Sequence, residues 1–381
     1  MKILHLCLGA FFPDNYSYQE NMLPKFHKNM GYEVEVIASQ ETFDKNGKRT
    51  HTDFSGSYQN EYDIKVTRLK YAFPQKVNYK LKRYIGVYTE IKECKPDVIF
   101  MHNCQFLSVF SVIKYLKKHP EVKLYVDNHA DLANSATSFV SKNLLHKGLW
   151  RYIARKIAPY TEKFYGVLPA RVEFLTDIYN LPQEKCELLV MGADDDEIKE
   201  ENLEKWRQEK RDEYNVNEKL VLMTGGKIDH NKPQTIDLMK SVNDLGRNDV
   251  VLIVFGSVTP ELKQAFNEQI SENVKYIGWK NSKDLYKELA AADVVIFPGL
   301  HSVLWEQTVA MGKPCIFKKI NGATHIDIGG NCLYFEEDSI DEYKRVIEKA
   351  ILSLEMLRQN ANKKERMRFL YSNIARCSIG E

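Results

Sequence analysis

Short β-rich runs alternate with helical patterns along the chain, and this alternation most limits the folds that it can adopt. The first half has such runs at 2–8, 33–39, 64–69, 98–102, 123–127 and 187–191. The second half has them at 220–223, 250–255, 274–277, 294–297 and 315–318. Strands that alternate with helices build βαβ units, in which the strands are parallel. The sequence therefore predicts an α/β fold with two parallel sheets in tandem.

The length of the chain supports two domains. A chain of 381 residues is too long for one compact core and suits two domains of ordinary size. An acidic, loop-like stretch at 192–202 separates the two series of strands. We expect two Rossmann-like domains, 1–195 and 196–361, that face a central cleft.

Composition indicates a reduced, water-soluble protein. Hydrophobic residues make up 44% and charged residues 28% of the chain, as in globular proteins. The 7 cysteines are dispersed without a CxxC pair, which favours free thiols in the cytoplasm. The apolar run at the N-terminus is too short for a signal peptide, and no apolar run is long enough to span a bilayer. We expect a cytoplasmic protein.

Positive charge is concentrated in one part of the chain. Residues 65–160 contain 18 Lys and Arg against 6 Asp and Glu, a net of +12, whereas the whole chain carries only +2. An anionic partner is expected for such a region. The stretches 71–90 and 141–164 mix these cations with aromatic and aliphatic residues at helical spacing, which is typical of helices on anionic membranes. Ordinary surface helices with snorkelling cations remain the alternative.

Two segments that follow apolar runs, 224–233 and 298–314, contain the polar residues that are best suited to binding a ligand. Turns from strand to helix bind ligands in open α/β sheets, because free N–H groups and the helix dipole favour an anion there. Lys227 and Lys232 add two cations beside the first turn, and Glu306 and Gln307 lie where the second opens into a helix. A diphosphate, a ribose and a sugar would satisfy these groups together.

The two segments resemble motifs of the family 4 retaining glycosyltransferases, which have the GT-B fold. That family reads Gly-Arg-x-x-x-x-Lys-Gly where this chain has 226–233, and Glu-Ala-x-Ala-x-Gly-x-Pro where it has 307–314. The resemblance implies donor binding by the C-terminal domain, acceptor binding by the N-terminal domain, and a final helix, 362–381, that packs back on the N-terminal domain. It also implies a UDP- or GDP-linked sugar as donor substrate, with no cofactor and no metal.

The resemblance assigns the donor diphosphate to Gly226, Lys227 and Lys232. Lysine at 227 keeps the charge of the family's arginine but gives up the bidentate fork. Gly278 and Trp279 match a Gly-aromatic turn beside the nucleotide base, where backbone groups would contact the base. We expect the Trp279 side chain itself in the core.

The second motif departs from the family pattern. Counting back from Pro314 places the family's ribose-binding glutamate at Gln307, one residue after Glu306, and we slightly favour Glu306 for the ribose. One of these two side chains is expected to face solvent. The family's first glutamate is missing, and His301 is a candidate replacement. Ser302 is expected to cap a helix that begins at Val303, whose amides would face the phosphate.

Histidines and aromatic residues mark the N-terminal domain. His129 follows the run 123–127, matches a family histidine that faces the sugar, and is our catalytic candidate together with Lys232. His102 ends the preceding run, and we expect one of these two histidines to be structural. The first turn lacks the usual Gly-Gly pair, and its Tyr16, Tyr18 and Gln19 are expected to bind the acceptor, although a plain loop is the alternative.

The remaining acidic triplet does not predict a metal site. Asp194-Asp195-Asp196 resembles a DxD motif, but it lies at the domain junction, and we interpret it as a solvated turn.

The function that the resemblance implies is glycosyl transfer from a nucleoside-diphosphate sugar to a hydroxyl of a glycan or lipid-linked acceptor, as in bacterial surface polysaccharide synthesis. Two alternatives stay open: an inactive nucleotide-sugar-binding subunit and a UDP-N-acetylhexosamine epimerase. A dinucleotide oxidoreductase is disfavoured because no GxGxxG follows the first strand. We expect no nucleic-acid partner, because no recognisable reading module is present.

Overall fold

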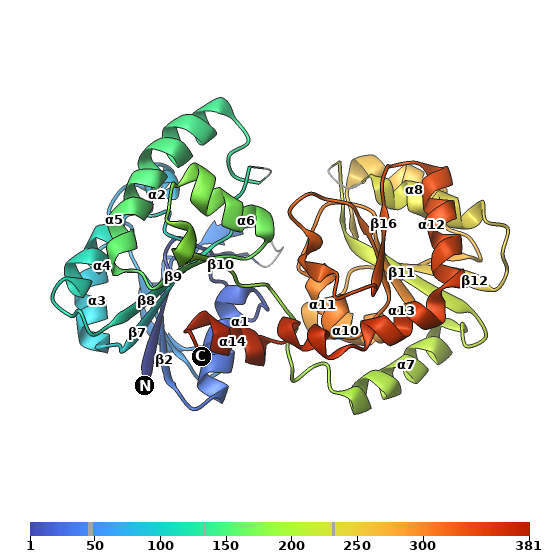
Figure 1. Ribbon diagram of the computed structural model, residues 1–381, viewed down its shortest axis with the longest axis horizontal. Helices are drawn as coiled ribbons and strands as arrows, with labels where there is room; N and C mark the ends of the chain where they lie inside the picture. Colours follow the sequence, from blue (N-terminus) through green and yellow to red (C-terminus); the bar gives the residue numbers. More distant parts are fainter. Residues whose placement is uncertain (45–48, 133, 231–232) are drawn as a thin grey trace. The chain divides into compact units, whose positions relative to one another are not determined.

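The computed structural model of the chain describes residues 1–44, 49–132, 134–230 and 233–381. These residues form two compact units, which are described separately here (Figure 1). Unit 1 comprises Met1–Met191 and Tyr371–Glu381, and unit 2 comprises Gly192–Leu370. The change of unit therefore falls after Met191, whereas the sequence analysis placed it after residue 195. Of the segment 362–381, only Tyr371–Glu381 belongs to unit 1.

Unit 1 is built around an eight-stranded sheet in the order β10-β9-β8-β7-β1-β2-β6-β5. All neighbours are parallel except β5 and β6, which are antiparallel. A separate antiparallel hairpin joins β3 and β4. The strands are β1 (Lys2–Cys7), β2 (Glu33–Ser39), β3 (Glu41–Phe43), β4 (Arg49–His51), β5 (Gly56–Gln59), β6 (Lys65–Leu69), β7 (Val98–His102), β8 (Lys123–Asn128), β9 (Lys163–Gly166) and β10 (Cys186–Leu188).

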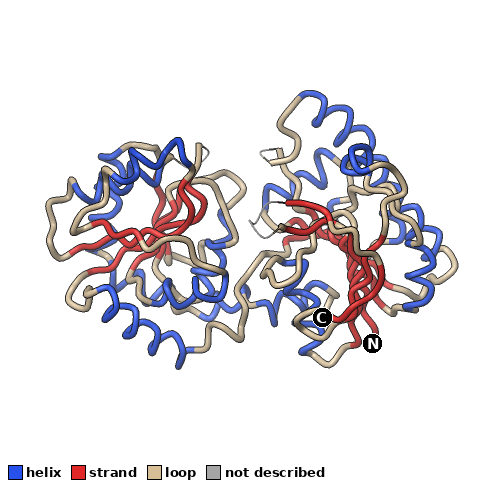
Figure 2. The backbone as a smooth tube through the Cα atoms, turned by 180° about the vertical axis from the view of Figure 1, so that it is seen from behind, coloured by secondary structure: helices blue, strands red, loops and turns tan. Residues whose placement is uncertain are grey.

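Helices cover both faces of this sheet (Figure 2). The last helix, α14 (Tyr371–Ser378), packs against α1 (Gln19–Asn29), with the rings of Phe26 and Tyr371 6.1 Å apart. The chain thus returns its end to the first βα unit. The other helices of unit 1 are α2 (Gln75–Leu81), α3 (Val87–Cys94), α4 (Val109–Leu116), η1 (Ser141–Trp150), α5 (Arg151–Ile157), η2 (Ala158–Tyr160), α6 (Pro169–Glu173), η3 (Phe174–Ile178) and η4 (Gln183–Lys185).

Unit 2 has a six-stranded, fully parallel sheet in the order β13-β12-β11-β14-β15-β16. Its strands are β11 (Leu220–Ile228), β12 (Val250–Val258), β13 (Val274–Tyr276), β14 (Val294–Phe297), β15 (Cys315–Lys318) and β16 (Cys332–Phe335). Its helices are α7 (Glu200–Tyr214), α8 (Gln234–Asn243), η5 (Pro260–Leu262), α9 (Lys263–Asn267), α10 (Ser282–Ala290), α11 (Leu304–Ala310), η6 (Thr324–Ile326), α12 (Ile340–Leu352), α13 (Leu354–Ala361) and η7 (Lys364–Phe369).

The central strands are buried on both faces, which explains their nearly continuous apolar sequences. All of β14 is buried, and so are the first seven residues of β12. Two polar residues interrupt these apolar sequences in unit 1. They are His5 in β1 and His102 in β7, and both are fully buried. Buried imidazoles need hydrogen-bond partners, so these positions require an account of their own.

The α/β prediction with two parallel-sheet units is confirmed, but some elements differ from expectation. The strands at 33–39, 98–102, 294–297 and 315–318 have the predicted bounds. Strands β9 and β16 were not predicted, and β9 takes up the end of the stretch 141–164 that was expected to be helical. No helix among the described residues has both the length and the apolar character needed to cross a membrane.

Candidate functional site

The carboxyl ends of four neighbouring strands bring most of the predicted donor residues to one edge of the sheet in unit 2. Strands β11, β12, β13 and β14 are adjacent and parallel, so their carboxyl ends lie on the same side. Lys227 lies near the end of β11, Gly278 follows β13, and the loop 298–303 follows β14. This is the edge at which open α/β sheets bind ligands.

The segment that was expected to turn after Met223 is instead a continuation of β11. Residues Thr224–Ile228 stay in register with β12, with Gly226 opposite Gly256. A Cβ atom on Gly256 would lie only 1.8 Å from the carbonyl oxygen of Gly226. Glycine at 256 therefore lets the two strands approach closely while it adopts a φ of +120°, which other residues rarely adopt.

Of the two lysines predicted to bind the diphosphate, the structure describes only Lys227. The side chain of Lys227 is 69% exposed, and its Nζ lies 3.1 Å from Oδ2 of Asp229. The Asp229 side chain is only 10% exposed, so the solvent-exposed ammonium group of Lys227 is held from one side and is open to a phosphate on the other. Lys232 lies outside the described residues.

Gly278 adopts a φ of +74°, and its carbonyl oxygen accepts a 2.9 Å hydrogen bond from the N–H of Gly256. The expectation that the Trp279 side chain belongs to the core is wrong, because this side chain is 69% exposed. An exposed indole beside the sheet edge is available for stacking.

The expected cap of the helix after β14 is also wrong. Helix α11 begins at Leu304, its N-cap residue is Val303, and no side chain caps it. Ser302 contributes only its carbonyl oxygen, which accepts a 3.0 Å hydrogen bond from the N–H of Trp305.

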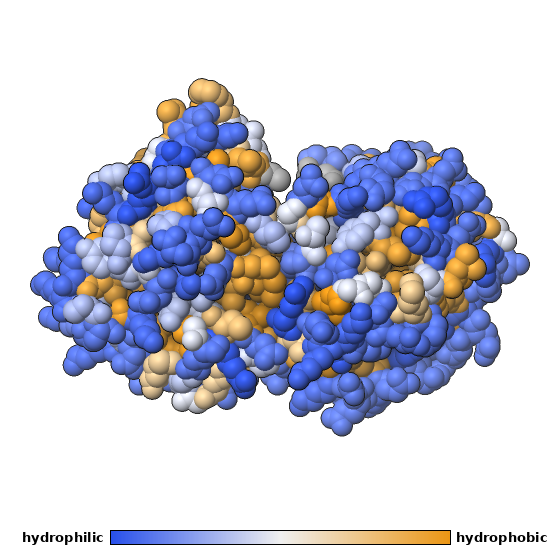
Figure 3. Space-filling model, in the orientation of Figure 1, coloured by the Kyte–Doolittle hydropathy of each residue, from blue (hydrophilic) through white to orange (hydrophobic). Residues whose placement is uncertain are grey.

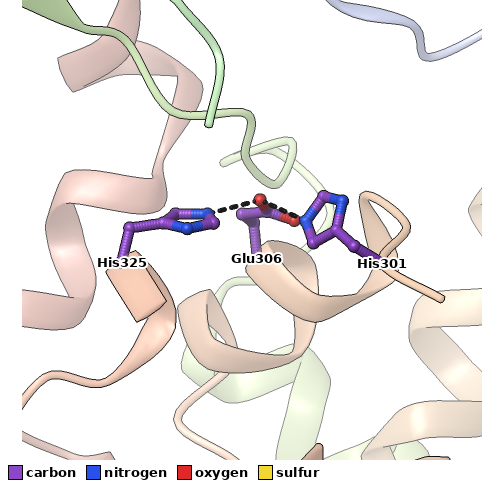
Figure 4. Close-up of side chains that lie close together, drawn as sticks. All are labelled: His301, Glu306 and His325. Carbon is purple, nitrogen blue, oxygen red and sulfur yellow. Dashed lines mark hydrogen bonds and ion pairs between the residues drawn. The ribbon is translucent and has the colours of Figure 1, made fainter. Parts of the chain in front are cut away.

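His301, Glu306 and His325 form a compact cluster behind this loop (Figure 4). The Nε2 atoms of His301 and His325 lie 2.9 and 2.7 Å from the same carboxylate oxygen, Oε1 of Glu306. The three residues come from the loop before α11, from α11 itself and from η6. Because a carboxylate only accepts hydrogen bonds, both Nε2 atoms carry hydrogen.

The electrostatics of this cluster favour an ionised carboxylate. Burial acts to raise the pKa of Glu306, but the two imidazoles outweigh it and lower the pKa to about 2. Oε2 of Glu306 and Nδ1 of His325 have no partner among the described residues. Two histidines and one carboxylate with ligand atoms within 4.8 Å of one another could also hold a divalent ion.

These contacts bear on which of Glu306 and Gln307 is suited to bind the ribose. Both side chains are buried, so the expectation that one of them faces solvent is wrong. The Glu306 side chain is fully buried and its Oε1 atom accepts from two histidines, so only the buried Oε2 atom remains for another hydrogen bond.

In unit 1, His129 follows β8 at the carboxyl edge of the sheet, and its side chain is 23% exposed. Its Nε2 atom lies 3.3 Å from Oδ2 of Asp127 and 4.0 Å from a carboxylate oxygen of Glu20. Burial acts to lower the pKa of His129, but Asp127 outweighs this effect and raises the pKa. His102 is fully buried and cannot contact a ligand in solvent.

The predicted acceptor residues lie at the start of α1. The rings of Tyr16 and Tyr18 stack with their centroids 5.5 Å apart, and Tyr18 is 41% exposed. Gln19 is buried, and neither atom of its amide has a partner among the described residues. Glu20 follows Gln19 directly and approaches His129, so this turn and the end of β8 lie together.

The acidic triplet is not a simple solvated turn. Asp194 is buried, its backbone N–H donates to the hydroxyl of Tyr286, and its Oδ1 accepts from the N–H of Asp196.

Sequence reasoning missed Asp127 and His325 as members of these clusters. A signal existed for Asp127, because it stands two residues before His129 at a strand end. His325 lies in the short helix η6, nineteen residues beyond Glu306, and no spacing rule connects the two.

The comparisons with known proteins agree with this architecture. Residues 204–368, less than half of the chain, match the family model described as "Glycosyl transferases group 1". No curated protein matches the chain.

Several solved structures share the fold over nearly the whole chain. A glycosyltransferase from Rickettsia africae is 15% identical with a TM-score of 0.66, covering 99% of this chain and 96% of that one. HepE from Anabaena, in complex with UDP and glucose, is 16% identical with a TM-score of 0.65, covering 99% and 98%. A UDP-GlcNAc 2-epimerase from Neisseria meningitidis is 11% identical with a TM-score of 0.63, covering 99% and 98%. The chain therefore has the GT-B fold, and its C-terminal unit matches the group 1 glycosyltransferases.

Proposed function

We propose that the protein transfers a sugar, with retention of configuration, from a nucleoside-diphosphate sugar to a hydroxyl of a glycan or lipid-linked acceptor, and that it needs no metal. One observation carries this proposal. The segment that matches the group 1 glycosyltransferase model also presents Lys227, Trp279 and His301 around one edge of a parallel sheet.

Each group has a chemical task in this proposal. Lys227 neutralises charge that develops on the leaving diphosphate, which is an electrostatic form of catalysis. Gln307 takes the ribose hydroxyls, because Glu306 is held by two histidines. His301 contacts the transferred sugar, and His129, with Tyr16, Tyr18 and Gln19, contacts the sugar or the acceptor. UDP is the favoured nucleotide, since a similar structure contains UDP and glucose, and a GDP-linked donor is the alternative.

Features of unit 1 support the proposed acceptor class. A groove of about 480 Å³ is lined by Lys147, Gly148, Arg151, Tyr152, Arg155 and Lys156. Large apolar side chains nearby are exposed, including Phe139 at 77% and Leu144 at 64%. Figure 3 shows hydrophobic atoms among polar ones at the tip of this unit. Cations beside exposed apolar groups favour a peripheral position on an anionic membrane, where a lipid-linked acceptor of surface polysaccharide synthesis would be found.

A panel of UDP- and GDP-linked sugars with lipid-linked acceptors tests this function. We expect acceptor-dependent release of nucleoside diphosphate and a product that keeps the anomeric configuration of the donor. Replacing Lys227 by Ala should lower kcat/KM about 30-fold, the value of one charged hydrogen bond of about 2 kcal/mol. Lys227→Arg should retain most activity, and Lys283→Ala, an exposed lysine of α10, serves as the matched control.

Two alternatives give different results in the same assay. An epimerase, supported by the epimerase structure of similar fold, would convert the donor's sugar without an acceptor. An inactive subunit would bind the nucleotide sugar and release nothing across the panel. Either result would reject the transferase.

A further inference from the structure

An unbroken row of hydrogen-bonded side chains runs through the interior of unit 1. His5 Nε2 lies 3.0 Å from Nδ1 of His27, and His5 Nδ1 lies 3.0 Å from Nε2 of His102. The Nδ1 atom of His102 lies 3.0 Å from Oδ2 of Asp127. We call these four side chains, on α1, β1, β7 and β8, the buried histidine chain.

Both ends of the buried histidine chain are hydrogen-bond acceptors. At one end, Nε2 of His27 lies 2.9 Å from the carbonyl oxygen of Ala375 in α14. At the other end is the carboxylate of Asp127, whose second oxygen accepts a 2.9 Å bond from the N–H of Asn103. All four side chains are shielded from solvent, so water cannot supply a missing hydrogen.

Counting hydrogens shows what these ends require. A row of three imidazoles has two internal contacts and two end contacts, and each contact needs one hydrogen. Three neutral imidazoles carry only three hydrogens on nitrogen, one each. Four are needed, so the row must hold one proton more than three neutral imidazoles and an ionised Asp127 provide, either on an imidazole or on the carboxylate.

Electrostatics place this extra proton beside Asp127. Burial lowers the pKa of His5 far below its usual range and that of His27 to about 4. Burial acts to raise the pKa of Asp127, but His129 and His102 outweigh it and hold the pKa well below the ordinary value. The carboxylate of Asp127 faces His102 and His129 with Oδ2 and accepts from the N–H of Asn103 with Oδ1, contacts that suit an ionised acceptor, so we place the extra proton on the interior imidazole beside it, His102.

A second proton arrangement has to be considered, because the hydroxyl of Ser378 lies 3.2 Å from Nε2 of His27. If Ser378 donated to His27, all three imidazoles could be neutral. The lone pair of His27 Nε2 would then face the Ala375 oxygen at 2.9 Å, and Ser378 would give up its own 2.8 Å bond to that oxygen. Both changes are unfavourable, so the charged chain is preferred.

The buried histidine chain is linked to the candidate site because Asp127 also contacts His129. The same Oδ2 atom that accepts from His102 lies 3.3 Å from Nε2 of His129. This contact fixes hydrogen on Nε2 of His129. Nδ1 has no hydrogen-bond partner among the described residues, so it is the atom available to a substrate hydroxyl.

We propose that the buried histidine chain stores one proton next to Asp127, and that it thereby positions His129 and sets the pH range in which His129 meets the substrate as a neutral imidazole. The inference rests on the proposed function only for the identity of the substrate. His102, His5 and His27 are positioning residues, since none of them reaches solvent.

The other charged groups around His129 do not take the place of the proton stored beside Asp127. Glu20 of α1 lies 4.0 Å from its Nε2, and Arg171 of α6, which acts to lower the pKa of His129, is held by Asp131 at 3.0 Å. The stored proton at His102 offsets the charge of Asp127. Its removal leaves Asp127 to attract a proton to His129, which raises the pKa of His129.

Nuclear magnetic resonance of the full chain with ¹⁵N-labelled histidine tests the proposal without any turnover. In the wild type at neutral pH, we expect one interior imidazole with hydrogen on both nitrogens, and a separate titration of His129. Three neutral interior imidazoles would overturn the proposal. This result is independent of whether the protein proves to be a transferase.

Variants test whether the stored proton affects the titration of His129. His102→Asn keeps a donor toward Asp127 but removes the charge, so the midpoint of the His129 titration should rise by about 1 pH unit or more. His119→Asn, at an exposed histidine paired with Glu121, should leave the midpoint unchanged. Where turnover is measurable, the acidic limb of kcat/KM should shift in the same direction. An unmoved midpoint in a folded His102→Asn protein overturns the coupling, and the wild-type spectrum decides if that variant does not fold.

Discussion

Nε2 of His325 donates a 2.7 Å hydrogen bond to Oε1 of Glu306, and both side chains are almost completely shielded from solvent. His301 donates to the same oxygen from the other side. A buried carboxylate held by two imidazoles organises the loop after β14, so the neighbourhood of the candidate donor site depends on a charge that never contacts water.

Glu306→Gln should lower the free energy of unfolding by about 3 kcal/mol, because an amide cannot supply the charge that both imidazoles face. Urea denaturation at neutral pH measures this loss. Glu348→Gln, at an exposed position of α12, should change stability by no more than about 0.5 kcal/mol. Equal stability of the two variants would show that the cluster contributes nothing.

The same carboxylate predicts a pH dependence of stability. Its pKa falls from the ordinary 4.5 to about 2 on folding, so its contribution is fully present above pH 4.5 and is lost as the pH falls toward 2. A shift of this size corresponds to about 3 kcal/mol. Unfolding curves of the wild type and Glu306→Gln should converge across this window, and curves that stay parallel would contradict the assignment.

We expect activity to survive exhaustive treatment with EDTA, because direct hydrogen bonds already join His301, Glu306 and His325. Elemental analysis of the purified protein should find less than stoichiometric zinc, iron or manganese. One equivalent of metal that disappears in Glu306→Gln would instead establish a metal site in this cluster.

Gly256→Ala should be severely destabilising, by about 3 kcal/mol, since its Cβ would meet the carbonyl oxygen of Gly226 at 1.8 Å. Gly246→Ala is the matched control, because Gly246 also has positive φ, +64°, but nothing lies within 4 Å of its Cβ position. We expect about 1 kcal/mol there. Chemical denaturation gives both values, and equal losses would mean that the close approach of β11 and β12 is not needed.

Binding to vesicles tests the basic groove of unit 1. Replacing Lys147, Arg155 and Lys156 together by Ala should weaken binding to vesicles rich in phosphatidylglycerol about 100-fold, at about 1 kcal/mol for each cation. The control replaces three exposed lysines elsewhere in the basic region, Lys70, Lys92 and Lys95. Equal loss in both triple variants would show that net charge alone matters.

Much of the fold could be predicted because its signals are local. The apolar runs of β7, β14 and β15 gave the bounds of those strands, since parallel strands buried on both faces are continuously apolar. Strand β9 was missed because KFYG follows a basic helix without a turn signal. The exposure of the Trp279 side chain was also missed, because burial depends on the packing of distant segments.

The clusters could not be predicted from spacing. Glu306 and His325 are joined by folding alone, and His5, His27 and His102 come from three different elements. Single histidines in apolar runs indicate buried polar groups, but only the structure shows which of them touch.

Hydrogen–deuterium exchange of the full chain, with and without UDP-glucose or a GDP-linked sugar, tests most directly whether the nucleotide sugar binds at the carboxyl edge of the sheet in unit 2. We predict that ligand slows exchange in peptides covering 224–230, 277–280 and 298–307. Protection confined to other segments, or none at saturating concentrations of every nucleotide sugar, would contradict the proposed site.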